Sequence, residues 1–501
     1  MGNPIKKLLQ QTAIYGLSNI VARLINYLLV PLHTYLMVTA DYGSVGELYA
    51  YITFINVLLT YGMETTFFRY YKSDDVNKNE VYTTILISLV VSSSIFLVVS
   101  FLAMYSIAGW IGYATAPEYI FCLLLIAAID AITAIPFGRL RAENKPLKYV
   151  SIKIATIVLN VFFNIFFLWL CPYILKHYPD SYITSCVSSI YNPHKMPGYI
   201  LYANLIASVS TFIFLGKDLL DVRSSFNTIL WKKLLHYGSP LIIGGLAGMT
   251  NEVIDRILLK YLLPTAIAKS ELGIYNACYK LSILMTLFVQ AFRMAGEPFF
   301  LSHAKDKNSP QLYATISQYF LIAGCIVFLG VMANIEWIKF FIAPAYHDGL
   351  VIVPLLLLAN LLLGMFYNFS VAFKIGNATS TLATISIIGA IITIVLNVLL
   401  IPLYGYVGSA IATLVCYASI AVMGYLLAQK YFKIPYPIFL FGMYLLNTVL
   451  VYAVFTVLPI QHWLLKTIAM NAILIFYIGY FAYLEKEVVA KIYQSFKKKL
   501  A

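Results

Sequence analysis

Charged side chains are scarce in this sequence, because only 11% of its 501 residues are Asp, Glu, Lys or Arg. A soluble domain carries about 25% charged residues. Hydrophobic residues make up 61% of the chain, and its mean hydropathy is +0.83. A water-soluble core cannot hide so much apolar surface, so most of it must face lipid or other helices in a bilayer. The composition therefore excludes a soluble globular protein and predicts an all-α, polytopic membrane protein.

The sequence also lacks the motifs of the common enzyme and cofactor classes. It contains no Gly-rich phosphate-binding loop, no HExxH helix and no paired CxxC motif. Cys171 and Cys186 could pair in the longest outer loop, 172–197, although two unpaired thiols are the favoured interpretation. We predict no catalytic residue, no metal site and no cofactor. The net charge of +13 does not indicate a nucleic-acid partner, because the basic residues lie in the loops of a membrane protein.

Long apolar runs dominate what is present. Each is close to the 20 residues, roughly, that a helix needs to cross the hydrocarbon layer. The runs must be helical, because lipid offers the backbone no hydrogen-bond partners. The fourteen predicted spans are 11–37, 45–68, 81–104, 118–137, 149–171, 198–216, 234–259, 272–295, 310–333, 351–372, 381–401, 407–428, 438–458 and 464–484.

The distribution of Lys and Arg between the loops predicts the orientation. With the N-terminus in the cytoplasm, 23 of the 34 basic residues fall in inner segments, six in outer segments and five within spans. Inner loops of membrane proteins are enriched in Lys and Arg. Both termini are therefore predicted to be cytoplasmic. The first span has no small-residue cleavage site and is followed directly by a second, which indicates a retained helix rather than a signal peptide.

The chain repeats itself. The hexapeptide Thr156–Val161 in the fifth span recurs as Thr393–Val398 in the eleventh, and each copy follows a short inner loop that carries Asn144 or Asn377. These matches predict duplication of a six-span unit. Because six is even, the two copies share one orientation and form a parallel repeat about an axis along the membrane normal.

The predicted architecture follows from this duplication. Residues 1–233 form an N-terminal six-helix lobe, residues 234–430 form a C-terminal six-helix lobe, and residues 431–501 hold spans thirteen and fourteen with a basic cytoplasmic tail. Transporters with such repeats often bind their substrate between the two halves.

Ionisable residues within the spans are the best pointers to function, because a charge inside the bilayer is costly unless it faces a cavity or a partner. Arg23 in span one and Lys280 in span eight have no acidic residue on their own helix turns. One such cation in each half indicates an anionic substrate. The predicted substrate-binding residues are Arg23, Lys280, Asn19, Asn26 and Arg256. The alternatives are an interhelical pair of Arg23 with Glu64 or Asp130, and a structural pair of Arg256 with Glu252.

Span seven also carries candidate ligands for a coupling ion. Asn251, Glu252 and Asp255 are oxygen-bearing residues within two turns, which suits Na⁺ or a proton, although a structural pair is the favoured interpretation. Asn160 and Asn397 occupy equivalent places in the repeat. They either line a cavity or bond neighbouring helices together, and membrane asparagines often do the latter.

At this point the chain resembles a known family. Six plus six plus two spans without a large soluble part are typical of the polysaccharide exporters of the multidrug/oligosaccharidyl-lipid/polysaccharide (MOP) superfamily, above all the bacterial Wzx-type flippases of O-antigen or capsule repeat units. The segments that carry the resemblance are Tyr61–Arg69, Arg139–Asn144, Tyr275–Lys280 and Ala291–Phe299. It extends over essentially the whole chain.

The resemblance implies a flippase that moves undecaprenyl-pyrophosphate-linked oligosaccharide from the inner to the outer leaflet of the bacterial inner membrane. In related lipid-linked precursor flippases, arginines of spans one and eight lie near the pyrophosphate. Arg23 fits the first position, whereas Lys280 at the second keeps the charge but loses the bidentate geometry. Spans thirteen and fourteen are implied to form a groove for the lipid tail. A polysaccharide polymerase and a chain-length regulator are implied as partners.

Two other classes remain as alternatives. An ion-coupled drug or cation antiporter of the same superfamily would share the fold but should prefer acidic residues in its cavity. A membrane glycosyltransferase or sugar polymerase would be an enzyme with a larger catalytic outer loop, whereas loop 172–197 offers only Asp180, His194 and Lys195. We therefore predict a transporter, not an enzyme.

Overall fold

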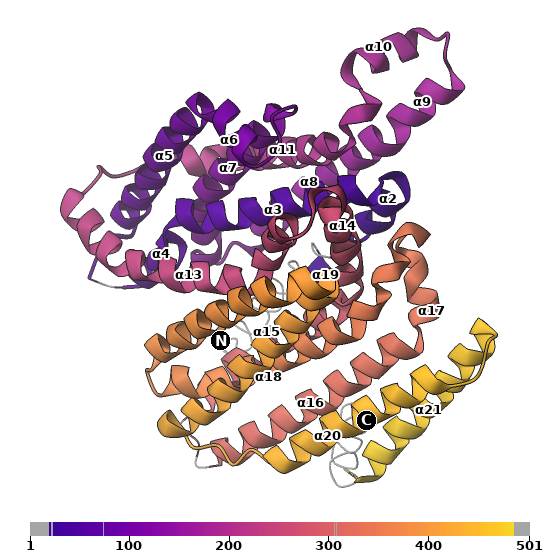
Figure 1. The fold of residues 1–501 in the computed structure, drawn as a ribbon. Helices are drawn as coiled ribbons and strands as arrows, with labels where there is room; N and C mark the ends of the chain where they lie inside the picture. Colours follow the sequence, from indigo (N-terminus) through magenta and orange to yellow (C-terminus); the bar gives the residue numbers. More distant parts are fainter. Residues whose placement is uncertain (1–19, 22–23, 74, 305, 307, 485–501) are drawn as a thin grey trace, which may run out of the picture.

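The computed structural model describes residues 20–484 apart from positions 22, 23, 74, 305 and 307. Within these residues the chain is helical and contains no strand, as the composition predicts. The helices lie roughly along one direction and form two stacked bundles (Figure 1).

The first bundle is built from the first half of the chain. α7 lies at its centre and packs against α3, α5, α8 and α11. The side chains of α7 are buried along most of its length, whereas α5 and α8 turn one face outward. The helices are α2 (Leu29–Leu36), α3 (Thr39–Thr60), α4 (Met63–Tyr71), α5 (Lys78–Leu102), α6 (Met104–Trp110), α7 (Pro117–Ala142), α8 (Pro146–Ile165), α9 (Cys171–His177), α10 (Tyr182–Ile190), α11 (Met196–Phe214) and α12 (Gly216–Leu220), with a π-helical segment η1 (Phe166–Leu170) between α8 and α9.

The second bundle follows the same principle. α18 packs against α15, α16 and α19, and α16 in turn contacts α20 and α21 on the outside of this bundle. The helices are α13 (Thr228–Leu262), α14 (Thr265–Leu281), α15 (Ile283–Ser302), α16 (Ser309–Ala333), α17 (Ile335–Ile338), α18 (Val353–Ile375), α19 (Thr379–Tyr431), α20 (Ile438–Val457) and α21 (Trp463–Leu484), with 3₁₀ segments at Lys339–Phe341 and Pro344–Ile352.

Side-chain caps fix where two of the long helices begin. Asn77 accepts a hydrogen bond from the backbone N–H of Asn79 at the start of α5, and Asn227 accepts one from Leu230 at the start of α13. A capping side chain satisfies a backbone donor that the first turn of a helix leaves without a partner. Both helices therefore begin among the residues that precede the apolar runs 81–104 and 234–259.

The predicted spans coincide with long apolar helices in most of the chain. Among the described residues, nine helices are long and apolar enough to cross a membrane, or ten if α14 and α15, which meet at a 49° bend, form one span. α19 covers two predicted spans, because the chain folds back at Gly405, whose φ of 55° and ψ of −137° are not helical. Of the first span, residues 11–19, 22 and 23 lie outside the described residues, and its remainder contains the shorter apolar helix Leu24–Leu36. The count of fourteen remains a prediction.

Predicted span two, 45–68, is interrupted. α3 ends at Thr60, and Tyr61 and Gly62 adopt left-handed φ values of 31° and 74° before α4 begins. A Cβ at Gly62 would lie 2.4 Å from the carbonyl oxygen of Gly238 on α13. Glycine is required here for its backbone conformation and for the close approach of α13. A hydropathy window cannot detect such a break.

The two loops that carry Asn144 and Asn377 have similar backbones. Asn144 follows α7 with a φ of 55°, and Asn377 follows α18 with a φ of 54°. In both loops the residue after the asparagine donates its N–H back to the helix end, from Lys145 to Leu140 at 2.9 Å and from Ala378 to Phe373 at 2.7 Å. Asparagine tolerates the left-handed region better than most residues. The two loops named in the repeat thus share one conformation.

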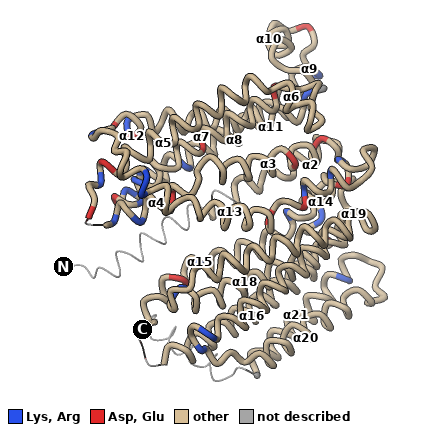
Figure 2. The backbone as a smooth tube through the Cα atoms, turned by 60° about the vertical axis from the view of Figure 1, so that its left-hand side comes forward, with Lys and Arg blue, Asp and Glu red and all other residues tan. Residues whose placement is uncertain are grey.

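The two ends of the bundle differ in charge. Lys and Arg gather at the end that carries loops 72–77, 143–145 and 215–227, which we call the basic end (Figure 2). The opposite end carries the protruding α9 and α10, and we call it the hairpin end (Figure 1).

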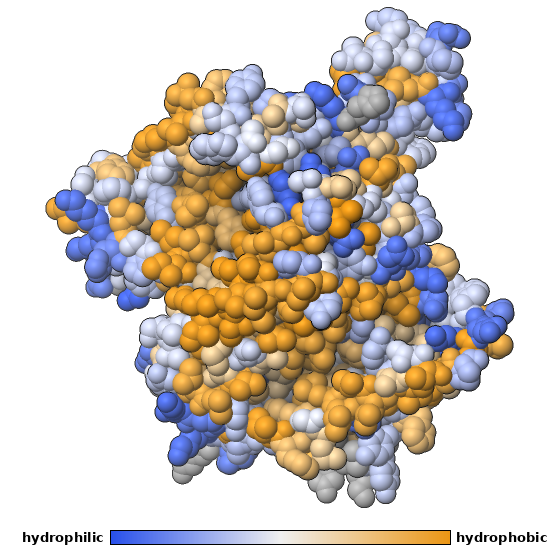
Figure 3. Space-filling view, in the orientation of Figure 1, coloured by the Kyte–Doolittle hydropathy of each residue, from blue (hydrophilic) through white to orange (hydrophobic). Residues whose placement is uncertain are grey.

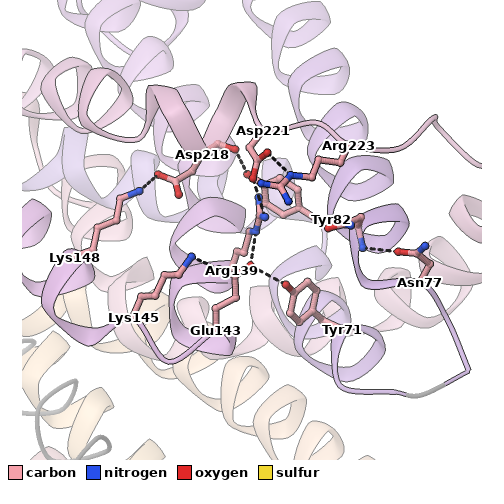
Figure 4. A network of polar contacts seen from close by, with 11 residues as sticks. Tyr71, Asn77, Tyr82, Arg139, Glu143, Lys145, Lys148, Asp218, Asp221 and Arg223 are labelled. Carbon is pink, nitrogen blue, oxygen red and sulfur yellow. Dashed lines mark hydrogen bonds and ion pairs between the residues drawn. The ribbon is translucent and has the colours of Figure 1, made fainter.

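At the basic end, Arg139 joins three segments. Its Nε lies 2.6 Å from Glu143 and its Nη2 lies 2.9 Å from Asp221, while its guanidinium lies 4.5 Å from the ring centre of Tyr82 (Figure 4). Tyr71 of α4 also donates to Glu143, at 3.0 Å. This network fastens α4, α5 and α7 to the segment that follows α12.

Candidate substrate site between the two halves

The two halves of the chain meet where α3 runs beside α13 and α14. At the hairpin end this contact is very close, because a Cβ at Gly43 would lie 1.9 Å from the carbonyl oxygen of Lys269, and one at Gly273 would lie 1.9 Å from that of Thr39. The hydroxyls of Thr39 and Ser270 lie 2.6 Å apart in the same contact. Glycines on both helices thus allow their backbones to touch.

A buried ion pair closes the same end. Lys260 of α13 pairs with Glu47 of α3, whose side chain has no exposed surface, and Tyr113 donates to the second oxygen of Glu47 at 2.8 Å. Tyr51 and Tyr261 add a hydroxyl contact of 3.0 Å between the halves. The sequence interpretation missed this pair, because Lys260 lies one residue beyond the predicted span 234–259. The signal was Glu47, an acidic residue inside predicted span two.

Arg256 of α13 lies at the centre of a polar cluster next to this closure. Its Nη1 donates to the carboxylate of Asp255 at 3.0 Å and to the backbone carbonyl of Glu252 at 2.8 Å, and its Nε donates to Asn276 at 3.1 Å. The guanidinium lies 4.7 Å from the ring centre of Tyr279 on α14. The suggested pairing with Glu252 therefore involves its backbone, and Asp255 supplies the counter-charge.

The three predicted ion ligands are in different environments. Asn251 is bound to α19, because its Nδ2 donates to Ser386 O at 3.0 Å and its Oδ1 accepts from Thr393 at 3.3 Å. Asp255 is buried and accepts a hydrogen bond of 2.5 Å from Tyr275 in addition to the Arg256 contact. Glu252 is exposed. Of the three, Glu252 therefore has the carboxylate that is most open to a ligand.

A series of side-chain hydrogen bonds connects α2 and the residues just before it to α8. His33 Nε2 lies 2.9 Å from Asn164 Oδ1, Asn164 Nδ2 donates to Asn160 Oδ1 at 3.0 Å, and Asn160 Nδ2 lies 3.4 Å from Asn26 Oδ1. Asn160 thus bonds two helices together, as one of the two sequence interpretations proposed. This series ends at Asn26, whose exposed amide N–H₂ is its terminal donor group.

Lys280 lies one residue before the end of α14, next to the bend that begins α15. It is exposed, and its helix α14 contacts α2, which carries His33. α14 also packs against α3, whose Tyr42 has its ring centre 6.3 Å from that of His33. Cations of the second half and amides of the first therefore belong to one region between the halves.

Arg23 and Asn19 lie outside the described residues, so their places in this region remain predictions. Their proposed neighbours are described. Glu64 pairs with Arg141 of α7, and Asp130 accepts a hydrogen bond of 3.2 Å from Ser208. Glu64 therefore has another cation as its partner. Cys171 is buried and Cys186 is exposed, and both are free thiols.

Taken together, the region presents two cations, an exposed amide, an exposed carboxylate and aromatic rings between two helical bundles. Cations and amide N–H groups suit a phosphate-like anion, whereas hydroxyl-bearing rings and amides suit sugars.

The fold defines the class of protein, which is a polytopic membrane protein built like the transporters of the MOP superfamily. The structure aligns with the lipid II flippase MurJ in an inward closed conformation at a TM-score of 0.69, with 14% identity, over 96% of this chain and 100% of that one. It aligns with an inward-facing multidrug resistance MATE family transporter of the MOP superfamily at a TM-score of 0.59, with 15% identity, over 84% of this chain and 94% of that one.

Sequence comparison identifies the family. Residues 8–300 match the model of the polysaccharide biosynthesis protein family, and the chain belongs to this family. It is also 20% identical over 427 residues to Lsg locus protein 1 of Haemophilus influenzae, which covers 80% of this chain and 95% of the relative. The predicted relationship to the polysaccharide branch of the MOP superfamily is confirmed, and the family match together with the flippase and transporter folds favours a transporter over an enzyme.

Proposed function

We propose that the protein is a flippase that moves an undecaprenyl-pyrophosphate-linked oligosaccharide from the cytoplasmic to the outer leaflet of the bacterial inner membrane. The observation that carries the proposal is the cluster around Arg256 and Lys280 between the two halves of a chain that belongs to a polysaccharide biosynthesis family. A pyrophosphate needs cations, and its sugars need hydroxyl and amide partners. Membrane lipids and the lipid-linked oligosaccharide are the proposed partners, together with a polysaccharide polymerase and a chain-length regulator.

The proposed mechanism is alternating access. The head group enters between the halves from the basic end, which we propose faces the cytoplasm together with both termini. At this stage the hairpin end is closed by the ion pair of Glu47 with Lys260 and by the packing of Gly43 on Gly273. Rocking of the halves would separate this contact and expose the head group outside. The binding region lowers the cost of carrying polar groups across hydrocarbon, and no covalent step is needed.

We further propose that an ion gradient drives the cycle through the acidic residues of α13. Glu252 is the best candidate ligand for Na⁺ or a proton, because it is exposed beside Arg256 whereas Asp255 is bound to Arg256 and Tyr275. Asn251 is a less accessible candidate, since α19 occupies its side chain.

The test is translocation of a fluorescent undecaprenyl-pyrophosphate oligosaccharide in proteoliposomes. Wild type should move the lipid, and Arg23→Gln, Arg256→Gln and Lys280→Gln should each reduce the rate at least about tenfold, the equivalent of one lost charge-assisted contact of about 1.4 kcal/mol. Lys176→Gln is the matched control, because it removes an exposed lysine of α9 far from the region. Normal transport by all three variants would refute the site, whereas no transport by wild type would refute the flippase.

The same vesicles distinguish the antiporter. If wild type ignores several polyprenyl-linked oligosaccharides but exchanges a cationic dye for Na⁺ or protons, the protein is a drug or cation antiporter. The MATE-like fold makes that comparison necessary, since the fold is common to both activities.

A further inference from the structure

α8, η1 and α9 together form one unbroken helix of 32 residues, Pro146–His177. At a rise of 1.5 Å per residue this helix is about 48 Å long, whereas the hydrocarbon core of a bilayer is about 30 Å thick. Near its beginning, Lys148 pairs with Asp218 at the basic end. A helix that enters the hydrocarbon at Lys148 leaves it about 20 residues later, near Leu168. α9 and the α10 that follows it therefore lie at the level of the head groups.

Exposed apolar side chains continue along this helix to its end. Val158, Phe162, Trp169 and Tyr173 are each exposed by 40–56%. Such a surface on a membrane-spanning helix faces lipid, and Trp and Tyr gather where the hydrocarbon meets the head groups. Trp169 and Tyr173 lie at the level that the length of the helix assigns to this boundary. The lipid-facing surface of α8 therefore runs without interruption into α9.

α10 is amphipathic, and its apolar side points away from the protein. At about 100° per residue, Tyr182, Ile183, Cys186 and Ile190 fall on one side of the helix. The serines fall on the other side, at positions 185, 188 and 189. Tyr182, Ile183 and Ile190 are exposed by 84%, 58% and 56%, whereas Val187 at the edge of the apolar side is buried. α10 thus has an apolar side that is largely uncovered by the protein.

The polar side of α10 carries hydroxyl groups and no charge. Ser188 Oγ donates to the carbonyl of Ser185 at 3.0 Å, and Ser189 Oγ donates to that of Cys186 at 2.7 Å. A hydroxyl group that already has a partner leaves bulk water at a smaller cost than one without a partner. α10 is therefore suited to the boundary between head groups and acyl chains.

The α9–α10 hairpin projects sideways from the first bundle. In Figure 1 and in Figure 2 it is the part of this bundle that lies furthest from the second bundle. It does not cover the region between the halves, and the space beside the first bundle at this level belongs to the bilayer. On the face shown in Figure 3 the hairpin carries both apolar and polar residues, a mixture typical of the membrane–water interface.

Aromatic stacking fastens the base of the hairpin to the first bundle. The ring centre of Tyr191, just after α10, lies 4.8 Å from that of Tyr199 on α11, which lies 5.1 Å from that of Phe167 on η1. The backbone N–H of Asn192 donates to the hydroxyl of Tyr199 at 2.5 Å. Val187 of α10 belongs to the same buried cluster. A contact made by α10 is therefore transmitted to α8 and α11.

We infer that the apolar side of α10 binds the lipid bilayer at the boundary between head groups and acyl chains, in the leaflet at the hairpin end. This contact fixes the depth of the first bundle in the membrane while the second bundle rocks against it. The occupant is lipid, and not a second copy or another protein, because the lipid-facing surface of α8 continues into the hairpin. The site is separate from the region around Arg256 and is independent of the substrate.

The exposed thiol of Cys186 allows a direct test, because it lies on the apolar side of α10 and the other five cysteines are buried. The full-length protein is labelled there with the fluorophore NBD and reconstituted in vesicles of phosphatidylethanolamine and phosphatidylglycerol. A phospholipid with a nitroxide high in its acyl chain should quench this label at least about twofold more strongly than one with a nitroxide near the chain end. Aqueous iodide should quench it little.

The matched control moves the thiol to the opposite side of the same helix. Cys186→Ser combined with Ser188→Cys places the label on the polar side, where iodide should quench it and the nitroxide lipids should not. Equal quenching by iodide at both positions would show that the apolar side faces water. Protection of the Cys186 label from iodide and from both nitroxide lipids would show that a second copy of the protein covers it. Either result would overturn the inference.

Variants test which side chains make the contact. Tyr182→Ser together with Ile190→Ser should reduce the nitroxide quenching of the Cys186 label at least about twofold, because these residues supply much of the exposed apolar surface. Ser185→Ala together with Ser189→Ala changes the polar side and should leave the quenching unchanged. Equal effects of the two double variants would contradict the assignment. The measurement needs no transport, so its failure leaves the flippase proposal standing, and a failure of transport leaves the lipid contact standing.

Discussion

Lys260 and Glu47 lie 213 residues apart in the sequence, yet they form a buried ion pair that joins the two halves at the hairpin end. The Lys260 ammonium group also donates to the backbone carbonyl of Ile111, and Tyr113 donates to Glu47. A buried pair gains little over apolar residues of the same shape, but removal of one partner leaves a charge without compensation. We therefore expect the pair to act as a latch that holds the two halves together at the hairpin end.

Substitution of one partner should weaken the closure. Glu47→Gln or Lys260→Met alone should destabilise the protein by about 3 kcal/mol, whereas the double variant should recover part of this loss. Thermal unfolding of the detergent-solubilised protein measures all three. The control is Glu118→Gln, since Glu118 and Lys195 form an exposed pair at the same end, worth about 0–1 kcal/mol. Equal effects at Glu47 and Glu118 would contradict the latch.

A covalent latch should stop the cycle. The Oγ atoms of Thr39 and Ser270 lie 2.6 Å apart across the two halves, so Thr39→Cys combined with Ser270→Cys should form a disulfide on oxidation. Cys186 is exposed and should first be replaced by serine. Oxidation should abolish translocation in vesicles, and a reductant should restore it, because the hairpin end must open. The two single-cysteine variants are the controls, and full transport by the cross-linked protein would exclude opening at this contact.

The sequence predicts helices better than it predicts how they pair. Apolar runs fix the lengths of α5, α16 and α20, because the bilayer sets the length of a span. The repeat was also readable, since two asparagines in equivalent loops adopt the same left-handed conformation. The partners of side chains on other helices could not be predicted, as the pairing of Glu64 with Arg141 illustrates. Such partners depend on which helix faces meet, and hydropathy does not record faces.

The polar cluster was only partly predictable. Arg256 was singled out because it is a charge within a span. The spacing suggested a side-chain pair with Glu252, whereas the structure pairs Arg256 with Asp255 and bonds it to the backbone carbonyl of Glu252. Its contacts with Asn276 and Tyr279 arise because the chain turns between α13 and α14 and brings the two helices side by side. That turn lies in a short loop whose geometry no periodicity predicts.

The shared loop conformation predicts matched effects in the two repeats. Asn144 and Asn377 both have positive φ, so alanine at either position should destabilise the protein by about 1 kcal/mol, whereas glycine should be neutral or mildly stabilising. Thermal unfolding of the four single variants measures this. Asn192→Ala and Asn192→Gly are the comparison, because Asn192 has no positive φ. If alanine and glycine have the same effect at Asn144 or Asn377, the backbone argument is wrong.

The basic-end network predicts a loss of stability in acid. Burial raises the pKa of Glu143, but hydrogen bonds from Lys145, Arg139 and Tyr71 outweigh it and lower the pKa from 4.5 to about 2. Because the folded-state pKa is depressed, the stabilisation is fully present above about pH 4.5 and disappears as the pH falls toward 2. Partial exposure of the group reduces its size to about 2 kcal/mol.

Thermal unfolding at pH 7 and pH 3 should therefore show a smaller acid-induced loss in Glu143→Gln than in wild type, because glutamine cannot take up the proton. At pH 7 the same variant should be the less stable protein, since it lacks the charge that binds Arg139 and Lys145. Asp180→Asn, an exposed carboxylate of the hairpin loop, is the matched control. Wild type and Glu143→Gln should converge near pH 2, where the carboxyl group of Glu143 is half protonated in the folded protein. Parallel pH profiles for the two proteins would show that the fastening of α4 and α7 does not depend on this carboxylate.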